Sequence, residues 1–230
     1  MEFFVRTIAV LPLMLLGMSN AAANLVSNPS FETFTGTFDG TGASSIPVGS
    51  AELVGWNIVE NEIAVLRNGH VSNTASSDGN NFLDLTGFTD KGFPKGISQS
   101  LNGLVTGRTY SFALDLGIRN GLCVSGGNIC GGPIKVTASI GSAGGPTISQ
   151  TFTHASSDPG NIWDTFGFSF LADNPSMTLS ILGNQPAGLY IGLDNVSVVA
   201  AVPLPAAAWL FGTGLLTLLG VSKKRRLSVA

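Results

Sequence analysis

The sequence predicts an all-β protein built as a β-sandwich of the jelly-roll type. In several segments apolar and polar residues alternate at every second position, which is typical of strands with one buried and one solvated face. The central part of the chain is rich in Gly, Ser, Thr and Asn and poor in Glu and Lys, a composition that favours strands and tight turns. No apolar helical pattern of ten or more residues occurs between residues 24 and 201.

The expected strands follow one another along the chain with turn clusters between them. Their ranges are residues 56–67, 81–85, 97–101, 109–116, 134–140, 147–153, 164–170, 177–181 and 189–199. Alternation is especially clear from Thr109 onward, where Tyr110, Phe112 and Leu114 share one face. Gly, Pro, Asn and Asp mark the reversals, at residues 76–80, 141–146 and 156–161. The pattern therefore predicts two packed antiparallel sheets.

The first 23 residues predict a signal peptide. Arg6 precedes an apolar stretch of 12 residues, 7–18, and Ala21 and Ala23 are small residues of the kind that a signal peptidase reads. The alternative, a first transmembrane helix, needs an apolar stretch of roughly 20 residues and a following stop-transfer pattern. We therefore expect cleavage before Asn24 and export of the mature protein.

The last 29 residues have three ordered parts that predict a sorting tail. The first part is the motif Val202, Pro203, Leu204 and Pro205. An uncharged stretch of 16 residues, 206–221, follows, and as a helix it would be about 24 Å long, slightly less than the ~30 Å of a bilayer core. The last part is a basic cluster of Lys223, Lys224, Arg225 and Arg226. Such cations stay on the cytoplasmic side, so the residues upstream are expected on the outer side of the membrane.

The tail resembles the PEP-CTERM sorting signal of Gram-negative bacteria in its proline motif, its apolar stretch and its basic cluster. The resemblance implies export through the inner membrane, transient anchoring there, and processing by an exosortase-type membrane protease. The protein would then reach the cell surface or the extracellular matrix. The central acidic residue of the named motif is Leu204 here, which leaves the cleavage point open. A permanent C-terminal transmembrane anchor is the alternative interpretation.

Residues 24–201 make a segment of 178 residues, long enough for one domain with a sizeable core. This segment contains 6 Lys and Arg residues against 13 Asp and Glu residues, so the exported part is acidic although the whole chain has a net charge of only −3. Contacts with phosphate groups need clustered basic side chains. The sequence therefore predicts that the domain binds no nucleic acid.

Short segments at the two ends of this domain carry a second resemblance. Residues 24–32 (NLVSNPSFE) open the domain and residues 193–198 (LDNVSV) close it. Further matching segments lie between them, at residues 55–56, 97–101 and 107–112. Together they resemble the galactose-binding-like jelly rolls, the fold of many carbohydrate-binding modules. The resemblance implies a non-catalytic module that associates with sugar polymers, here exopolysaccharide, outside the cell.

The same resemblance implies a calcium site. In that fold the first and last strands lie side by side, which would bring Glu32 and Asp194 together, and many members hold a structural calcium ion there. Calcium takes about six to eight oxygen ligands, which two carboxylates and neighbouring carbonyl groups can supply. The alternative is that Glu32 is a loop acid and that Asp194 accepts backbone hydrogen bonds at a strand end. Asn28 either caps the turn or adds a carbonyl ligand, and both roles stay open.

The aromatic residues divide into two groups. Trp56 and Trp163 begin expected strands and, by the resemblance, are expected in the core. Phe88 and Phe93 lie in a loop with polar neighbours, where an exposed ring can stack on the apolar face of a sugar. The alternative is that one of these two rings closes an end of the sandwich. Phe88 and Phe93 are therefore the candidate ligand-binding residues.

Cys123 and Cys130 are the two cysteines of the chain. In an exported protein two nearby cysteines are paired more often than free, and the glycines between them let the segment fold back. A zinc site would need two further ligands with suitable spacing, and the neighbouring sequence offers none. We therefore expect a disulfide that closes a loop between two strands.

Few residues suggest catalysis. His70 and His154 lie in polar loop-like stretches without a surrounding motif. Glu60 and Glu62 are two positions apart, so both would project from one face of an expected strand, either as a glycosidase pair or, more commonly, as an exposed acidic strand edge. The chain has no nucleophile elbow, no His-Glu-x-x-His motif and no phosphate loop. The sequence predicts a non-enzymatic protein, and the alternatives are a secreted polysaccharide hydrolase and a purely structural matrix protein.

Overall fold

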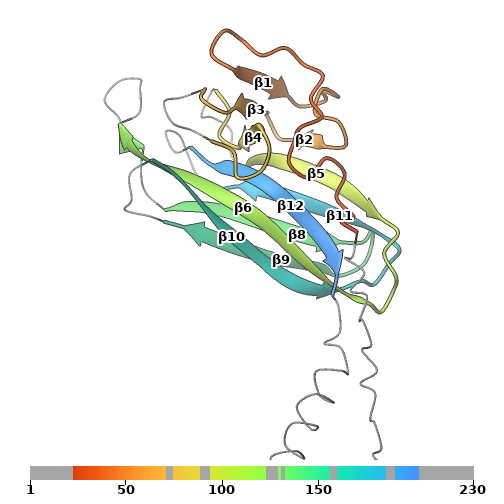
Figure 1. Cartoon of the computed structure of the whole chain (residues 1–230). Coiled ribbons are helices and arrows are strands. Elements are labelled where there is room, and N and C mark those ends of the chain that lie inside the picture. The colour runs from red at the N-terminus through yellow and green to blue at the C-terminus, as the bar shows by residue number, and fades with distance from the viewer. Residues whose placement is uncertain are drawn as a thin grey trace, which may run out of the picture.

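The computed structural model describes residues 23–70, 75–88, 94–122, 129–130, 133–155, 160–184 and 190–201. These residues form two antiparallel sheets and contain no helix, which confirms the predicted all-β sandwich (Figure 1). Residues 1–22 of the expected signal peptide and the expected sorting tail from Val202 onward lie outside the described residues.

The described residues contain no helix that is long and apolar enough to cross a membrane.

The larger sheet has seven strands, six of them in the order β1-β3-β4-β12-β6-β10, while β7 pairs with β6. Their bounds are β1 Ala43–Pro47, β3 Glu62–Arg67, β4 Asn81–Asp84, β12 Gly192–Ala200, β6 Thr109–Leu122, β10 Gly160–Leu171 and β7 Ile129–Cys130. The second sheet has five strands in the order β2-β5-β11-β8-β9. Their bounds are β2 Asn57–Val59, β5 Lys95–Asn102, β11 Ser176–Gly183, β8 Ile134–Gly141 and β9 Thr147–His154. All pairings between named strands are antiparallel, as the alternation predicted.

The single strand predicted at residues 56–67 is wrong, because the structure divides it into β2 and β3, which belong to different sheets. Glu60 and Asn61 between them have positive φ angles of 59° and 43°. Two successive residues in the left-handed region turn the chain, so no strand continues through them. Glu60 therefore lies in a turn while Glu62 begins β3, and the prediction that both project from one strand face is also wrong.

The inward faces of both sheets pack into one large core, and Trp56 belongs to it as predicted. The indole of Trp56 lies against the buried ring of Phe31, with 5.7 Å between ring centroids, and its Nε1–H donates to the carbonyl oxygen of Asn28 at 3.0 Å. Burying a large apolar side chain of this kind stabilises the fold by roughly 1.5–3 kcal/mol. The opening segment, residues 24–32, is thereby attached to the core.

Trp163 lies outside this main core, so the prediction for it is wrong. It sits within β10, half-buried, and packs against a smaller cluster around Phe82, with 5.8 Å between the ring centroids. Its indole lies over Gly117 on the neighbouring strand β6 and over Gly192 on β12, the strand beyond it, and an added Cβ at either glycine would approach the ring to 2.9 Å. The two glycines thus make room for a ring on the outer side of the sheet, an effect of strand register that the alternation pattern does not contain.

The predicted disulfide falls partly on residues that the structure does not describe, namely Cys123 and the loop that follows. We expect one intramolecular disulfide between Cys123 and Cys130 because export and close spacing favour pairing. Cys123→Ser should lower the free energy of unfolding by roughly 2–3 kcal/mol without preventing folding, because the closed loop is short. Peptide mapping after non-reducing proteolysis measures the pairing. Two alkylatable thiols in native protein would contradict it.

Candidate functional site

The predicted acidic pair meets at one turn, residues 76–81. Asp194 on β12 is buried, and its Oδ2 accepts the backbone N–H groups of Ser77 and Asp78, both at 2.8 Å. Its Oδ1 accepts the N–H of Asn195, also at 2.8 Å. Burial raises the pKa of Asp194 to about 7, although these hydrogen bonds favour the charged form.

Glu32 holds the other end of the same turn. Its Oε1 accepts the N–H groups of Asn80 and Asn81, both at 2.7 Å. Gly79 lies against this carboxylate with a φ of +69°, and an added Cβ would come within 2.5 Å of Oε1. Glu32 and Asp194 therefore clasp one turn between them, and each accepts backbone hydrogen bonds there.

The expected calcium ion stays a prediction. Within the described ranges no group of three or more His, Cys, Asp and Glu side chains is arranged to hold a metal ion. Glu32 and Asp194 bring carboxylate oxygens to one turn, so further ligands would have to be carbonyl oxygens, which calcium accepts. Of the two open roles of Asn28, the contacts match the cap: its Oδ1 accepts the N–H of Thr33 at 2.9 Å.

A third carboxylate, which the sequence analysis missed, supports the same turn. Asp115 on β6 is buried and pairs in register with Asp194. It accepts hydrogen bonds from Ser77 Oγ, from Thr165 Oγ1 at 2.6 Å and from Asn195 Nδ2 at 3.1 Å. The one signal of this role in the sequence was the charge of Asp115 in the otherwise uncharged run from Tyr110 to Leu116.

The outer face of the five-stranded sheet carries hydroxyl and amide side chains, and we call it the hydroxyl face. Its polar members are Asn57, Ser98, Ser100, Asn102, Thr137, Ser139, Thr147, Ser149, Thr151, Thr153, Ser176, Thr178 and Ser180. Val59 and Leu182 are aliphatic side chains on the same face. Lys95 and Lys135 are the two Lys, Arg, Asp or Glu residues in these five strands, and Lys95 is buried. The face is therefore polar but almost without charge.

Strand register aligns these side chains in rows across the sheet. One row crosses all five strands, through Asn57, Ser98, Ser180, Ser139 and Ser149. Within such rows hydroxyl groups bond to one another, as Thr137 Oγ1 and Thr151 Oγ1 do at 2.7 Å. Neighbouring strands are about 4.8 Å apart and alternate residues about 7 Å apart, so the face presents a regular grid of donors and acceptors.

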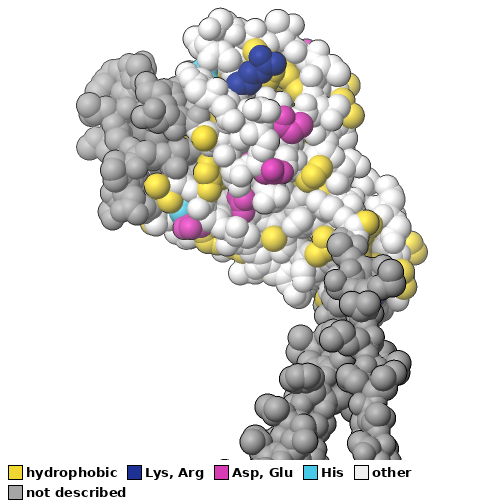
Figure 2. Space-filling view, viewed as in Figure 1, with side chains coloured by type: hydrophobic (Ala, Val, Ile, Leu, Met, Phe, Trp, Pro, Cys, Tyr) yellow, Lys and Arg dark blue, Asp and Glu magenta, His cyan; other side chains and the backbone are white. Residues whose placement is uncertain are grey.

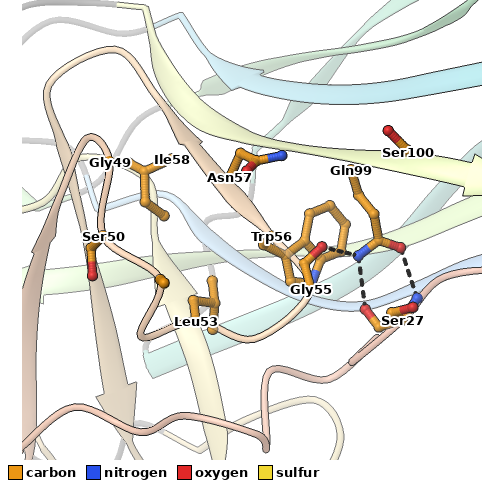
Figure 3. A pocket seen from close by; sticks show the side chains of 11 residues that line it. Ser27, Gly49, Ser50, Leu53, Gly55, Trp56, Asn57, Ile58, Gln99 and Ser100 are labelled. Carbon is orange, nitrogen blue, oxygen red and sulfur yellow. Dashed lines mark hydrogen bonds between the residues drawn. The ribbon is translucent and has the colours of Figure 1, made fainter.

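A pocket of about 650 Å³ opens at the β2 edge of the hydroxyl face (Figure 3). Asn57 and Ser100 belong to both the pocket and the face. Gln99 forms part of its wall, with Nε2 donating to the carbonyl oxygens of Ser27 at 3.0 Å and Gly55 at 2.7 Å and Oε1 accepting the N–H of Ser27 at 2.7 Å. The pocket is thus a rigid, polar hollow beside the sheet.

A second pocket, of about 430 Å³, combines Arg67 and Glu32 with asparagine side chains. The Arg67 guanidinium carbon lies 4.0 Å from the ring centroid of Phe38, which orients it by a cation–π contact. On the face that Figure 2 shows, a few carboxylates and one small group of basic side-chain atoms lie on an otherwise uncharged surface. Because this pocket contains one cation and one carboxylate, it favours a ligand without net charge.

The predicted ligand-binding ring Phe88 is 52% exposed, which agrees with the expectation of an exposed loop aromatic. It lies in the connection between β4 and β5, and β5 is a strand of the hydroxyl face. Phe93 lies outside the described residues. Whether either ring touches a sugar remains a prediction.

The two histidines and Glu62 have structural contacts. His70 Nδ1 lies 2.9 Å from the carbonyl oxygen of Thr41. His154 is buried, with Nδ1 3.3 Å from Asp164 Oδ2 and Nε2 3.2 Å from the carbonyl oxygen of Ile162. Glu62 accepts from Ser45 Oγ and lies 3.6 Å from the buried ammonium group of Lys95. These contacts hold the three side chains against neighbouring strands and loops.

No protein-family model and no curated protein matches this sequence. Solved structures resemble its fold. The module TmCBM61, determined in complex with β-1,4-galactotriose, matches with a TM-score of 0.50 and 14% identity over 78% of this chain and 100% of that chain. The α-L-arabinofuranosidase MgGH51, determined with bound arabinose, matches with a TM-score of 0.50 and 16% identity over 78% of this chain. The match spans only 26% of that enzyme. At such low identity these likenesses show a shared β-sandwich fold.

Proposed function

We propose that this protein is a non-catalytic module that binds neutral polysaccharide on the outer side of the cell. The observation that carries the proposal is the hydroxyl face, with rows of Ser, Thr and Asn side chains across five strands and almost no charge. The likeness in fold to a module determined with galactotriose is consistent with it.

The chemistry of the hydroxyl face suits a sugar polymer without charge. Ser and Thr hydroxyls and Asn amides both donate and accept hydrogen bonds, as sugar hydroxyls do, so many pairings satisfy both partners. Removing these groups from water costs far less than removing charged side chains, provided that they regain hydrogen bonds. The regular spacing of hydroxyl and amide groups on the face suits the regular spacing of hydroxyl groups along a polysaccharide. The pocket at the β2 edge has room for a side group or chain end of the polymer.

The best test is binding of residues 24–201 to a panel of immobilised glycans. Ser180, which pairs with both Ser98 and Ser139, lies in the middle of the hydroxyl face. Ser180→Glu should weaken binding at least about tenfold, because its carboxylate stays buried and unpaired under a neutral ligand. The matched control is Ser169→Glu, which alters a strand serine on the opposite sheet.

Phe88→Ala tests the loop aromatic separately. A stacked ring contributes about 0.5–1.5 kcal/mol, so a roughly three- to tenfold loss is expected if Phe88 joins the hydroxyl face in binding. Normal binding by Ser180→Glu together with lost binding by Phe88→Ala would move the site to the loop. Binding that survives in every variant would contradict both sites.

The route to the outer side follows from the two ends of the sequence. We propose that the leader is removed before Asn24 and that an exosortase-type protease processes the motif Val202–Pro205 while the tail is in the inner membrane. The mature protein should then lack residues 1–23 and the segment from about residue 206 onward. Intact-mass measurement of protein from the native host checks this. A mature species that keeps Lys223 to Arg226 would instead favour a permanent anchor.

We also propose that a structural calcium ion binds at the turn that Glu32 and Asp194 hold. Its role would be to stabilise the clasped turn rather than to act on a substrate. The buried, readily protonated carboxyl of Asp194 supports the proposal, because a bound cation would compensate its charge.

A further inference from the structure

Both ends of the described domain lie at one end of the sandwich (Figure 1). The N–H of Leu25 donates to the carbonyl oxygen of Val198 near the end of β12, at 2.9 Å. The N–H of Ala201 donates to the carbonyl oxygen of Thr109 at the start of β6, at 3.0 Å. The chain therefore enters and leaves the domain beside the same strand ends.

The same end carries exposed apolar side chains. Leu171 is 57% exposed and Val105 is 55% exposed, the highest values among the large hydrophobic residues of the described part of the chain. Leu171 pairs in register with Thr109, and the N–H of Val105 donates to Tyr110 Oη at 2.9 Å. Val105, Thr109, Leu171 and Ala201 thus define one surface, which we call the exit end.

Charge at the exit end is balanced. Arg108 lies in the turn that contains Val105, and Asp173 follows Leu171, accepting from Ser142 Oγ at 2.9 Å. A surface with two exposed aliphatic side chains and no net charge suits an apolar partner better than an anionic one.

The short stretch of chain between Ala201 and the uncharged part of the tail restricts how far the exit end can lie from the membrane. Only five residue steps separate Ala201 from Ala206, where the uncharged stretch of the tail begins. Fully extended, they reach at most about 18 Å. The headgroup region on each side of a bilayer is roughly 5–8 Å thick, since the whole bilayer measures about 40–45 Å and its core about 30 Å.

We propose that, while the tail spans the membrane, the exit end rests on the outer surface of the lipid bilayer with Val105 and Leu171 among the headgroups. The inference rests on the proposed sorting tail. The long strands β10 and β12 end at the exit end and β6 begins there, so the sheets stand up from the membrane and the hydroxyl face remains open to a polymer (Figure 1). The motif Val202–Pro205 is then held at the bilayer surface.

Two aliphatic side chains do not by themselves bind a protein to a membrane. Each contributes at most about 1.5–3 kcal/mol, less than the cost of association for a free molecule. The tail removes that cost by holding the exit end at a high local concentration of lipid. Residues 24–201 alone should therefore not bind vesicles, and the contact should not depend on anionic lipid or on salt.

The test places a new tryptophan at the exit end. The full chain, expressed so that its leader is processed, is reconstituted in phosphatidylcholine nanodiscs whose acyl chains are brominated near the headgroups. Leu171→Trp is compared with Val48→Trp, a 53% exposed position after β1, far from the exit end. The emission of each variant is compared with that of the parent chain, because Trp56, Trp163 and Trp209 contribute the same background emission to all three proteins.

Most of the added emission should be quenched in Leu171→Trp and almost none in Val48→Trp. A flexible Gly-Ser spacer of 12 residues after Ala201 adds roughly 20 Å of average reach and should abolish the quenching while the chain stays in the nanodisc. Equal quenching with and without the spacer would overturn the tethered arrangement. An unquenched Leu171→Trp in a chain that is inserted would overturn the lipid contact alone. A chain that does not insert would overturn the sorting tail and this inference together.

Discussion

In calcium-free buffer, the free energy of unfolding of residues 24–201 should fall by a few kcal/mol between pH 5 and pH 8. Burial raises the pKa of Asp194 from 3.8 to about 7. Between these values the folded state keeps a proton that the unfolded state has released, so raising the pH removes stability. The loss begins near pH 4, is complete above the folded pKa, and amounts to at most about 4 kcal/mol.

Urea unfolding at several pH values with a chelator present measures this slope. Asp194→Asn cannot titrate, so its stability should be nearly independent of pH in this range. The pKa of Asp39 is lowered to about 2, chiefly by its hydrogen bond with Thr41. Its titration therefore changes the free energy of unfolding only below about pH 4, outside the range from pH 5 to pH 8. A slope in Asp194→Asn equal to that of the parent would show that another group is responsible.

Calcium should reverse this loss at pH 8 and have little effect at pH 5. An ion that binds only the folded state stabilises it by RT ln(1 + [L]/Kd), about 2.7 kcal/mol at a hundredfold excess over Kd. At low pH the protonated carboxyl of Asp194 is a poor ligand, so the gain disappears. Glu32→Gln should remove the stabilisation by calcium at pH 8. Identical unfolding with millimolar calcium and with chelator at pH 8 would exclude the site.

Gly96→Ala should destabilise the domain by about 3 kcal/mol or more, or prevent it from folding. Gly96 lies on β5 beside β11, and an added Cβ would come within 1.9 Å of the carbonyl oxygen of Ile181 and 2.9 Å of the Cα of Leu182. Both obstacles are backbone atoms, so the strand itself would have to move. In a domain of this size the loss corresponds to a fall in melting temperature of roughly 6–12 °C.

Gly40→Ala is the matched control, since no atom lies within 4 Å of its added Cβ. Its melting temperature should stay within a degree or two of the parent, because surface changes of this kind rarely exceed about 0.5 kcal/mol. A similar small change in Gly96→Ala would mean that β5 and β11 separate more easily than their register implies.

Local patterns in the sequence were sufficient for most strands. Alternation from Thr109 and from Ile134 predicted β6 and β8, because side chains on a strand point to opposite faces in turn and only one face is buried here. The same reasoning failed at Glu60 and Asn61. A change of sheet there depends on two positive φ angles, which alternation does not encode.

The candidate site was predicted only in part. The short motifs that contain Glu32 and Asp194 were recognisable because each is continuous in sequence, and the structure brings both residues to one turn. Asp115 was missed because its partners, Ser77, Thr165 and Asn195, come from distant parts of the chain. The hydroxyl face was missed as a surface because a lone Ser or Thr in a strand is unremarkable until register aligns it with others.

The sequence by itself determined the all-β class, the acidic charge of residues 24–201 and the positions of most strands. These properties depend on composition and on neighbours within a few positions, which physical preferences of strands and turns translate directly into local structure. Only the tertiary structure decided which strands pair, which polar residues share a face, and where the chain leaves the domain. Those features depend on contacts between residues up to 174 positions apart, such as Asn24 with Val198, and no local pattern specifies such contacts.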